Sequence, residues 1–368
     1  MQGKSAAASL TALGVSLALA ACGGSSATTS SGSSSTSSNS PAPPTSSGGA
    51  ASSNASGKPT LLVYSAQGYD KVTVAAFQKA TGIPTKLVDD STGPLLARIQ
   101  AERANPQWGV LWVDGATAFA SLDQQGLLQK GLKVPKLTSV GEGLVPSDGS
   151  FIPTGTTIAC TVIYDSHVIK TPPTTWQQLL ASAFKGKVGM NDPAVSGPTY
   201  PCVAGLMQSL GGVFQGEAYL KRLKANGLHV SQTNGDTLHL LQTGQISVGL
   251  IQSSAATGAA SKTPGLKVGY LPKVTLLPGA IGVDVKAPAA EQREAQQFID
   301  FILSSAGQKQ MQSGDPTGDS LYWPVVSAPS PLSGLPPLSS VSFQKIDPYL
   351  WGPREPQINN WFTANIVR

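Results

Sequence analysis

The chain has 368 residues, with 25 Lys and Arg against 20 Asp and Glu. The basic residues are scattered, so the sequence lacks the clustered positive patch of a nucleic-acid-binding surface. Its three histidines, His167, His229 and His239, have no spacing that recruits a serine nucleophile or a metal, and no Gly-rich nucleotide loop is present, which argues against an enzyme. We expect His167 after a hinge strand, His229 in a turn and His239 on a helix.

Residues 1–21 have the pattern of a lipoprotein export signal. Lys4 supplies the positive start, an apolar run extends from Ala6 to Ala20, and Leu19-Ala-Ala-Cys22 forms a small-residue cleavage box. We therefore predict that the mature chain begins at Cys22, which carries a lipid anchor on the outer face of the membrane. The alternative, a membrane-spanning helix, needs about 20 apolar residues and normally a charge cluster on its far side, whereas Gly and Ser follow here.

Residues 22–57 form the predicted tether. Gly23 to Gly57 contain only Gly, Ser, Thr, Ala, Asn and Pro, which cannot bury enough apolar surface to offset the entropy of ordering. A flexible coil of this length reaches about 30 Å. About 310 residues follow from Lys58, enough for two domains, and they contain no second apolar stretch that could cross a bilayer.

Cys160 and Cys202 are the cysteines that remain once Cys22 is assigned to the lipid. They lack the close spacing and the accompanying histidines of a metal or redox site. An exported protein permits disulfides, so we favour a structural disulfide over two free buried thiols.

Alternating strand and helix patterns follow in chain order. Three strand-turn-helix units predict an α/β layer with a parallel sheet. Their strands are expected at 60–64, 84–88 and 109–113, and their helices at 70–80, from 94 onward and at 116–125. Gly82 is expected to end the first helix.

A second set of elements predicts a second lobe. After a β-rich run at 158–165, these elements are helices at 176–183, 199–210, 217–226 and 236–243 and strands at 187–190 and 246–251. Strands at 267–271 and 280–285 then predict a return to the first lobe, closed by a helix at 288–305. We therefore expect a two-lobed α/β fold with lobe 1 at 58–160, lobe 2 at 161–265 and the return at 266–368.

Ligands of open α/β sheets lie beyond the carboxyl ends of the strands, where helix amino-termini attract anionic oxygens. The sequence places small hydroxyl and amide residues there, which predicts a cleft for an anionic or highly polar solute. Each residue could instead be a local helix cap. The candidates are Ser65, Gln67, Ser91, Thr92, Ser196, Gly197, Thr199, Gln252, Ser253 and Ser254.

Asp114 ends the apolar run 110–113 and would face the cleft, where its carboxylate could receive a ligand amine or a cation. A helix N-cap is the equal alternative. Trp112 shares the strand face of Asp114, as a core side chain or as a stacking partner.

The motifs of the chain resemble one family over about 60–362. These motifs are Leu62-Val-Tyr-Ser65, Phe77-Gln-Lys-Ala-Thr-Gly82, Val162-Ile-Tyr-Asp165, Pro173-Thr-Thr-Trp176, Phe184-Lys-Gly-Lys187, Thr243-Gly-Gln-Ile246, Ala295-Gln-Gln-Phe298, Gly307-Gln308 and Tyr322-Trp-Pro324. The chain resembles type 2 periplasmic solute-binding proteins of ABC importers, in the group with ferric-ion-, 2-aminoethylphosphonate-, thiamine- and polyamine-binding members. The resemblance implies a monomer that uses no cofactor, encloses a small solute, closes about hinge strands near 162–165 and delivers the solute to a membrane permease.

The resemblance also separates two subsites. Asp114 matches the carboxylate ligand of the iron-binding members, but Gly68 replaces their His and Ser254-Ala255 replace their tyrosine pair. Fe(III) needs anionic oxygen donors that serine does not supply at neutral pH, so we expect no metal site.

The neighbouring anion niche is matched by Ser196-Gly197-Pro198, Asn234 and Gln252. This favours a phosphonate, a phosphate ester or a thiamine form, with Trp112, Tyr200 or Tyr69 as stacking candidates. Ferric-ion binding, polyamine binding and a sensor lipoprotein of the same fold remain the alternatives.

Overall fold

The structure, a computed structural model, describes residues 60–368. The predicted export signal, Cys22 and the tether lie outside the described residues. None of the helices within the described range is long and apolar enough to cross a membrane.

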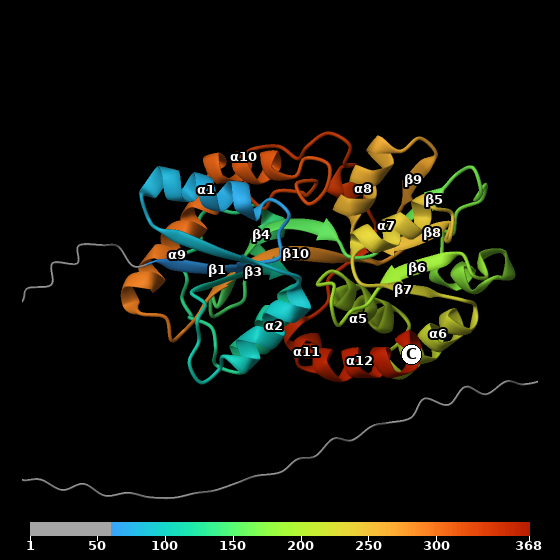
Figure 1. Ribbon diagram of the computed structural model, residues 1–368, viewed down its shortest axis with the longest axis horizontal. Coiled ribbons are helices and arrows are strands. Elements are labelled where there is room, and N and C mark those ends of the chain that lie inside the picture. Colours follow the sequence, from blue (N-terminus) through green and yellow to red (C-terminus); the bar gives the residue numbers. More distant parts are fainter. Residues whose placement is uncertain (1–59) are drawn as a thin grey trace, which may run out of the picture. The chain divides into compact units, whose positions relative to one another are not determined.

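The first lobe is built on a sheet of six strands in the order β11-β10-β3-β1-β2, with β4 also paired to β10 (Figure 1). The strands β1, β2 and β3 are parallel, which confirms the predicted parallel units. The strands β4 and β10 run antiparallel to each other. The bounds are Leu61–Ser65 for β1, Thr85–Asp89 for β2, Val110–Asp114 for β3, Phe151–Ile158 for β4, Val274–Val283 for β10 and Phe343–Gln344 for β11.

Helices cover both faces of this sheet. On one face, Phe77 of α1 packs edge-on against Phe298 of α9 at a centroid distance of 5.0 Å. On the other face, Leu95 of α2 and Phe119 of α3 are buried against the strands. Gly82 ends α1 in the left-handed conformation, as predicted. The helix bounds are Asp70–Thr81 for α1, Thr92–Ala101 for α2, Ala116–Gln124 for α3, Ser139–Glu142 for α4, Ala289–Ile302 for α9 and Ser305–Gly314 for α10.

The second lobe is built on a sheet of five strands in the order β7-β6-β8-β5-β9. The helices α5 and α6 contribute to the core on one face, and α7 and α8 to the core on the other. The strand bounds are Thr161–Asp165 for β5, Val188–Asn191 for β6, His229–Ser231 for β7, Val248–Ile251 for β8 and Leu266–Gly269 for β9. The helix bounds are Thr199–Ser209 for α5, Val213–Ala225 for α6, Asn234–Gln242 for α7 and Ser253–Lys262 for α8.

Two strand segments cross between the lobes where β4 leads into β5 and β9 leads into β10. At this crossing the amide of Ala159 donates to the carbonyl oxygen of Thr275 at 3.0 Å. The adjacent Cys160 forms a disulfide with Cys202 of α5, and their Cα atoms are 5.3 Å apart. The disulfide therefore joins the crossing segment to a helix of the second lobe.

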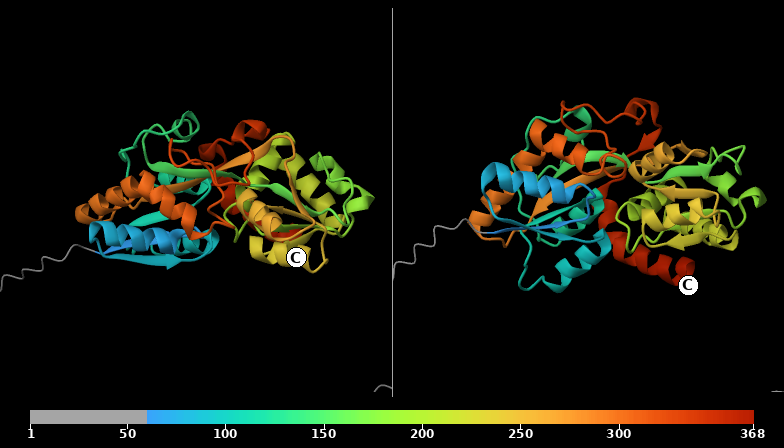
Figure 2. Two further views of the ribbon diagram at one scale, coloured as in Figure 1. Left: turned by 90° about the horizontal axis from the view of Figure 1, so that it is seen from above. Right: turned by 45° about the horizontal axis from the view of Figure 1, so that its top comes forward.

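The C-terminal segment contacts both lobes, as its red trace in Figure 2 shows. Gln124 of α3 donates to the carbonyl oxygen of Tyr349, while Tyr200 of α5 donates to that of Trp351. These contacts come from α11 (Pro348–Trp351), which is followed by a 3-10 turn (Gly352–Arg354), α12 (Glu355–Phe362) and a π-helical turn (Thr363–Val367). A further 3-10 turn spans Leu338–Ser340.

Two of the predicted elements were wrong in kind. The helix expected at 176–183 is a pair of 3-10 turns, Trp176–Leu180 and Ser182–Phe184, because Ala181 is extended between them. His229 begins strand β7 rather than lying in a turn, since it pairs with Gly189 of β6.

The predicted boundary elements also differ from the structure. The strand expected at 267–271 does not return to the first lobe, because β9 pairs with β5 in the second sheet. The expected hinge strand 162–165 is β5 itself, paired on both sides, so the crossing lies just before it at Ala159 and Cys160. The closing helix ends at Ile302, and Ser304 caps a separate helix, α10. The division of the chain at 161 and 266 stays a prediction.

We predict that replacing Cys160 and Cys202 with Ser lowers the free energy of unfolding by about 2–4 kcal/mol, because the disulfide closes a long loop in the unfolded chain. Urea denaturation of the oxidised wild type and the double variant measures the difference. Wild type treated with a reductant is the matched control and should unfold with the variant. Equal midpoints in all three samples would contradict a stabilising disulfide.

Candidate functional site

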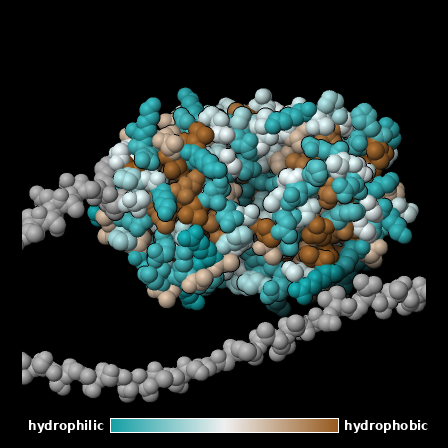
Figure 3. Space-filling view, viewed as in Figure 1, coloured by the Kyte–Doolittle hydropathy of each residue, from teal (hydrophilic) through white to brown (hydrophobic). Residues whose placement is uncertain are grey.

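A cavity of about 460 Å³ lies between the two sheets, with walls from both lobes. Figure 3 shows the surface hollowed in this region and bordered mainly by hydrophilic and intermediate residues. Seven of the sequence-predicted residues line the cavity. They are Ser91, Thr92, Asp114, Ser196, Gly197, Asn234 and Gln252.

One wall of the cavity is rich in hydrogen-bond donors, because three helices begin there. Ser91 and Thr92 stand at the start of α2, Gly197 precedes α5, and Asn234 and Gly235 open α7. Ser91 has an extended N-cap backbone but its side chain makes no capping hydrogen bond, so its hydroxyl is not used by its own helix. These helix starts direct positive dipole ends toward the cavity, which favours an anion.

A chain of amides fixes the polar side chains of the second lobe. Thr237 donates to Asn191 Oδ1 at 2.6 Å, so the Asn191 amide group turns the other way. Its nitrogen then donates to Ser196 Oγ at 3.2 Å and to Asn234 Oδ1 at 2.7 Å. Asn191 is fully buried, and it therefore acts as an internal support that orients two residues of the cavity wall.

Asp114 joins the two lobes. Gln67, from the loop after β1, donates to Asp114 Oδ1 at 3.1 Å, and Gln252, from the end of β8, donates to Asp114 Oδ2 at 2.8 Å. The Gln252 nitrogen also lies 3.1 Å from Thr157 Oγ1 of β4. One carboxylate therefore bridges an amide from each lobe.

Two further carboxylates make this end of the cavity acidic. Asp319 accepts hydrogen bonds from the Gly68 amide at 2.8 Å and from the Ser254 hydroxyl at 3.4 Å. Its own amide donates to Asp315 Oδ2 at 2.8 Å. Asp315 and Asp319 both line the cavity, as does Lys262 of α8. The acidic end is therefore defined by Asp114, Asp315 and Asp319.

Burial disfavours the charged forms of Asp114 and Asp319. Burial raises the pKa of Asp114 to about 7, with a further increase from the charge of Asp319, although hydrogen bonds from Gln67 and Gln252 act in the opposite direction. Burial also raises the pKa of Asp319, and the charge of Asp315 adds to this. A bound ammonium group would stabilise both ionised carboxylates.

Five sequence-predicted residues lie behind the cavity wall instead of in it. Gln67 and Ser254 hold the carboxylates of Asp114 and Asp319. Ser65 is fully buried, and its Oγ accepts the amide of Gln67. The Ser253 hydroxyl accepts the amide of Ile158, and the Thr199 amide donates to the Ser196 carbonyl oxygen. The last three residues therefore have local structural roles, which corrects their expected place in the cavity.

None of the three candidate stacking residues lines the cavity, and Trp112 takes the core position that was one of its two expected roles. Trp112 is fully buried and donates to Thr154 Oγ1 at 3.1 Å. Tyr69 packs on Trp112 at a centroid distance of 5.4 Å, and Tyr200 is buried beneath Trp351. All three rings belong to the cores of the lobes.

Asp315 and Asp319 were not among the residues predicted from the sequence. They do not follow a strand but lie in the turn after α10. Two aspartates that flank a Pro-Thr-Gly segment are a turn signal, but nothing in that pattern shows that the turn reaches the amino-terminus of α8. Within residues 60–368 no group of three or more His, Cys, Asp or Glu side chains is placed to hold a metal ion.

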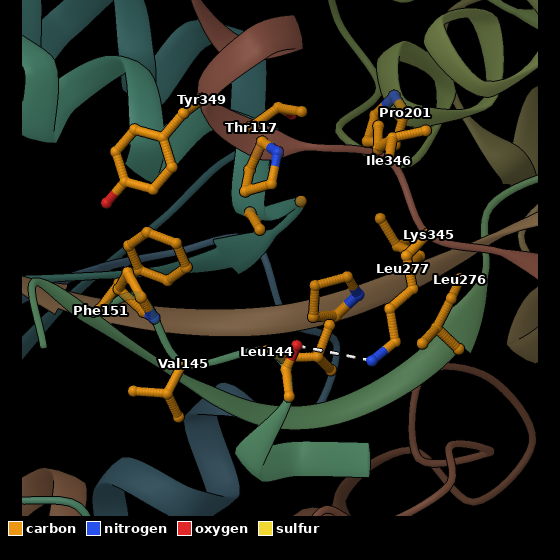
Figure 4. Close-up of a pocket in the computed structure, with 16 residues that line it drawn as sticks. Thr117, Leu144, Val145, Phe151, Pro201, Leu276, Leu277, Lys345, Ile346 and Tyr349 are labelled. Carbon is orange, nitrogen blue, oxygen red and sulfur yellow. Dashed lines mark hydrogen bonds between the residues drawn. The ribbon is translucent and has the colours of Figure 1, made fainter. Parts of the chain in front are cut away.

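A second cavity, of about 230 Å³, lies against β10 and the C-terminal segment (Figure 4). Its wall is largely apolar, with Leu276, Leu277, Phe151 and Ile346 among the lining side chains. Lys345 Nζ lies 3.5 Å from the carbonyl oxygen of Gly143 at one side. Few polar groups converge there, so the interlobe cavity is the better candidate for a polar solute.

Comparison with known proteins relates the chain to one protein family. Residues 73–327 match the family model of bacterial extracellular solute-binding proteins. The chain is 28% identical over 265 residues to a periplasmic protein of Salmonella typhimurium to which 2-aminoethylphosphonate binding is provisionally assigned, and the alignment covers 67% of this chain and 74% of that protein.

Solved structures share the fold. The periplasmic binding protein P5PA has a TM-score of 0.73 and 21% identity, over 83% of this chain and 99% of that one. AfuA from Actinobacillus pleuropneumoniae, solved with bound fructose-6-phosphate, has a TM-score of 0.72 and 19% identity, over 84% of this chain and 98% of that one. The two-lobed α/β fold of the periplasmic binding proteins is confirmed.

Proposed function

Because the chain belongs to the family of bacterial extracellular solute-binding proteins, we propose that its interlobe cavity captures a small zwitterion with a phosphonate or phosphate-ester head and an ammonium group. The captured solute is handed to the permease of an ABC importer. No catalytic step and no cofactor enter this proposal, and one copy of the chain suffices for it.

The observation that carries the proposal is that two kinds of polar group line one cavity. Hydroxyl groups, an amide and helix amino-termini are contributed by Ser91, Thr92, Ser196, Gly197 and Asn234. The carboxylates of Asp114, Asp315 and Asp319 line the same cavity, together with Lys262. An anionic head pairs with the first set and an ammonium group with the carboxylates, so one short zwitterion pairs with both.

The Salmonella relative supports this class of solute, since its provisional ligand is an aminoalkylphosphonate. A phosphate ester is the second candidate, because the fold is shared with a protein that binds fructose-6-phosphate. Thiamine forms lose support because Trp112, Tyr69 and Tyr200 are buried. Ferric ion is disfavoured because Ser254 and Ala255 supply no phenolate ligands. Polyamine is disfavoured because hydrogen-bond donors line one wall of the cavity, and a polyamine offers them no anionic acceptor.

Capture follows from closure. The crossing segments near Ala159 and Thr275 act as the hinge, and ligand contacts from both lobes stabilise the closed form that the permease recognises. A sensor partner would use the same closure, and co-purification of the chain with a permease or with a kinase would separate these two outcomes.

A matched pair of variants tests the proposed solute by isothermal titration calorimetry. Wild type should bind 2-aminoethylphosphonate at least about tenfold more tightly than ethylphosphonate, which lacks the amine, because an ion pair in a closed site is worth more than about 1.4 kcal/mol. Asp114→Asn should remove this preference. Ser196→Asp should weaken both ligands, because it places a negative charge beside the anionic head.

The surface variant Asp300→Asn, on the exposed side of α9, serves as the control and should behave as wild type. Circular dichroism verifies that each variant is folded. The proposal fails if wild type binds neither ligand, or if it binds ethylphosphonate as tightly as the zwitterion.

The pH dependence of affinity gives a second test. The ammonium group pairs with ionised Asp114, whose pKa in the empty protein lies at about 7, so binding requires loss of that proton below this pH. Affinity for 2-aminoethylphosphonate should therefore fall roughly tenfold per pH unit below about pH 7 and level off above it. In Asp114→Asn the ligand still titrates but residue 114 does not, so the plot of affinity against pH should be flatter than that of wild type. Parallel profiles in both proteins would contradict the role of Asp114.

The proposed location rests on the sequence. We propose that Cys22 carries the lipid and that residues 22–57 tether the binding unit to the outer face of the membrane. Cys22→Ser should release the protein into the soluble envelope or medium fraction, and fractionation followed by immunoblotting measures this. A variant in the tether, Ser25→Ala, is the control. Retention of Cys22→Ser in the membrane fraction would overturn the anchor.

A further inference from the structure

The two lobes meet through backbone atoms at one seam beside the donor wall. The amide of Gly93, at the start of α2, donates to the carbonyl oxygen of Val195 in the second lobe at 3.2 Å. Thr92 and Gly197 border both the solute cavity and a neighbouring space of about 470 Å³ on the other side of the seam. The seam therefore separates the solute cavity from that space.

Neither glycine at the seam leaves room for a side chain. A Cβ atom at Gly93 would lie 2.1 Å from the carbonyl oxygen of Ala194 in the opposite lobe. A Cβ atom at Gly197 would lie 2.3 Å from Oγ1 and 2.8 Å from Cβ of Thr92, again across the seam. Neither glycine has the positive φ that would by itself require Gly.

We propose that Gly93 and Gly197 form an interlobe latch, in which the absence of side chains lets the lobes close fully around the solute. They are positioning residues for closure. The effect of the latch on solute affinity depends on the proposed solute capture, whereas its effect on lobe separation does not.

Both glycines precede a proline, and proline restricts the backbone conformation of the residue before it. The effect of a new side chain across the seam must therefore be separated from its effect on the local backbone. Substitution of the group on the opposite side of the seam separates the two. The atoms that oppose Gly197 belong to the Thr92 side chain, which can be removed by substitution. The atom that opposes Gly93 is a backbone oxygen, which no side-chain substitution removes.

The experiment compares Gly197→Ala, Gly93→Ala and each of them combined with Thr92→Gly. Small-angle X-ray scattering measures the radius of gyration, and hydrogen exchange measures protection of the amide of residue 93, each with and without 2-aminoethylphosphonate. Both single variants should have a larger radius than wild type and faster exchange at residue 93. Affinity for 2-aminoethylphosphonate should fall at least about tenfold in each.

Thr92→Gly should restore compaction and protection to Gly197→Ala but not to Gly93→Ala. Gly269→Ala is the matched control, since its new Cβ would lie 4.0 Å from Val162 and it has no positive φ. Unchanged radius and exchange in Gly197→Ala would overturn the latch, and so would failure of the Thr92→Gly rescue. Absence of solute binding by wild type would overturn only the assigned solute, because radius and exchange still report on closure.

Discussion

The rest of the site depends on the carboxylate of Asp114, which is held between amides from opposite lobes. Its two oxygens accept from Gln67 at 3.1 Å and from Gln252 at 2.8 Å. Both donors are nearly fully buried, so the bridge is shielded from water and its hydrogen bonds are stronger than they would be on the surface. The carboxylate of Asp114 therefore links the end of a strand in the first lobe to the end of a strand in the second.

This bridge needs a frame that brings the ends of β3 and β8 face to face. The long strand β10, which is buried along its length, pairs with β3 and β4 and runs into the crossing between the lobes. Ser253, at the start of α8, accepts the amide of Ile158 at the same crossing. The Cys160–Cys202 disulfide attaches the crossing segment to α5 of the second lobe. These contacts hold the ends of β3 and β8 close to the crossing between the lobes.

Much of the fold could be predicted from the sequence, because the period of apolar residues is a local property. The strand that ends at Asp114 and the helix that ends at Gly82 are examples, since each carries its own boundary signal. The acidic end of the cavity could be predicted only in part. Asp319 reaches the site through a turn whose position is set by the packing of α10 on α1, a long-range contact that no local pattern encodes. The environment of Trp112 could not be predicted for the same reason. Strand alternation shows which face of the sheet carries its side chain, but not whether helices or solvent cover that face.

Under the proposed function, the donor groups and the carboxylates of the cavity would select a zwitterion through the groups that other solutes leave unpaired. In the closed cavity an anion that lacks an amine leaves Asp114 and Asp319 as neighbouring carboxylates whose pKa values burial has already raised. A cation that lacks an anionic head leaves the hydroxyl of Ser91, which does not cap α2, without an anionic partner. Either mismatch costs about 1–3 kcal/mol for each buried group left unsatisfied. Discrimination between solutes then depends on the charged groups of the solute and not on close contacts with the atoms between them, because the free-energy penalty comes from buried groups left unpaired.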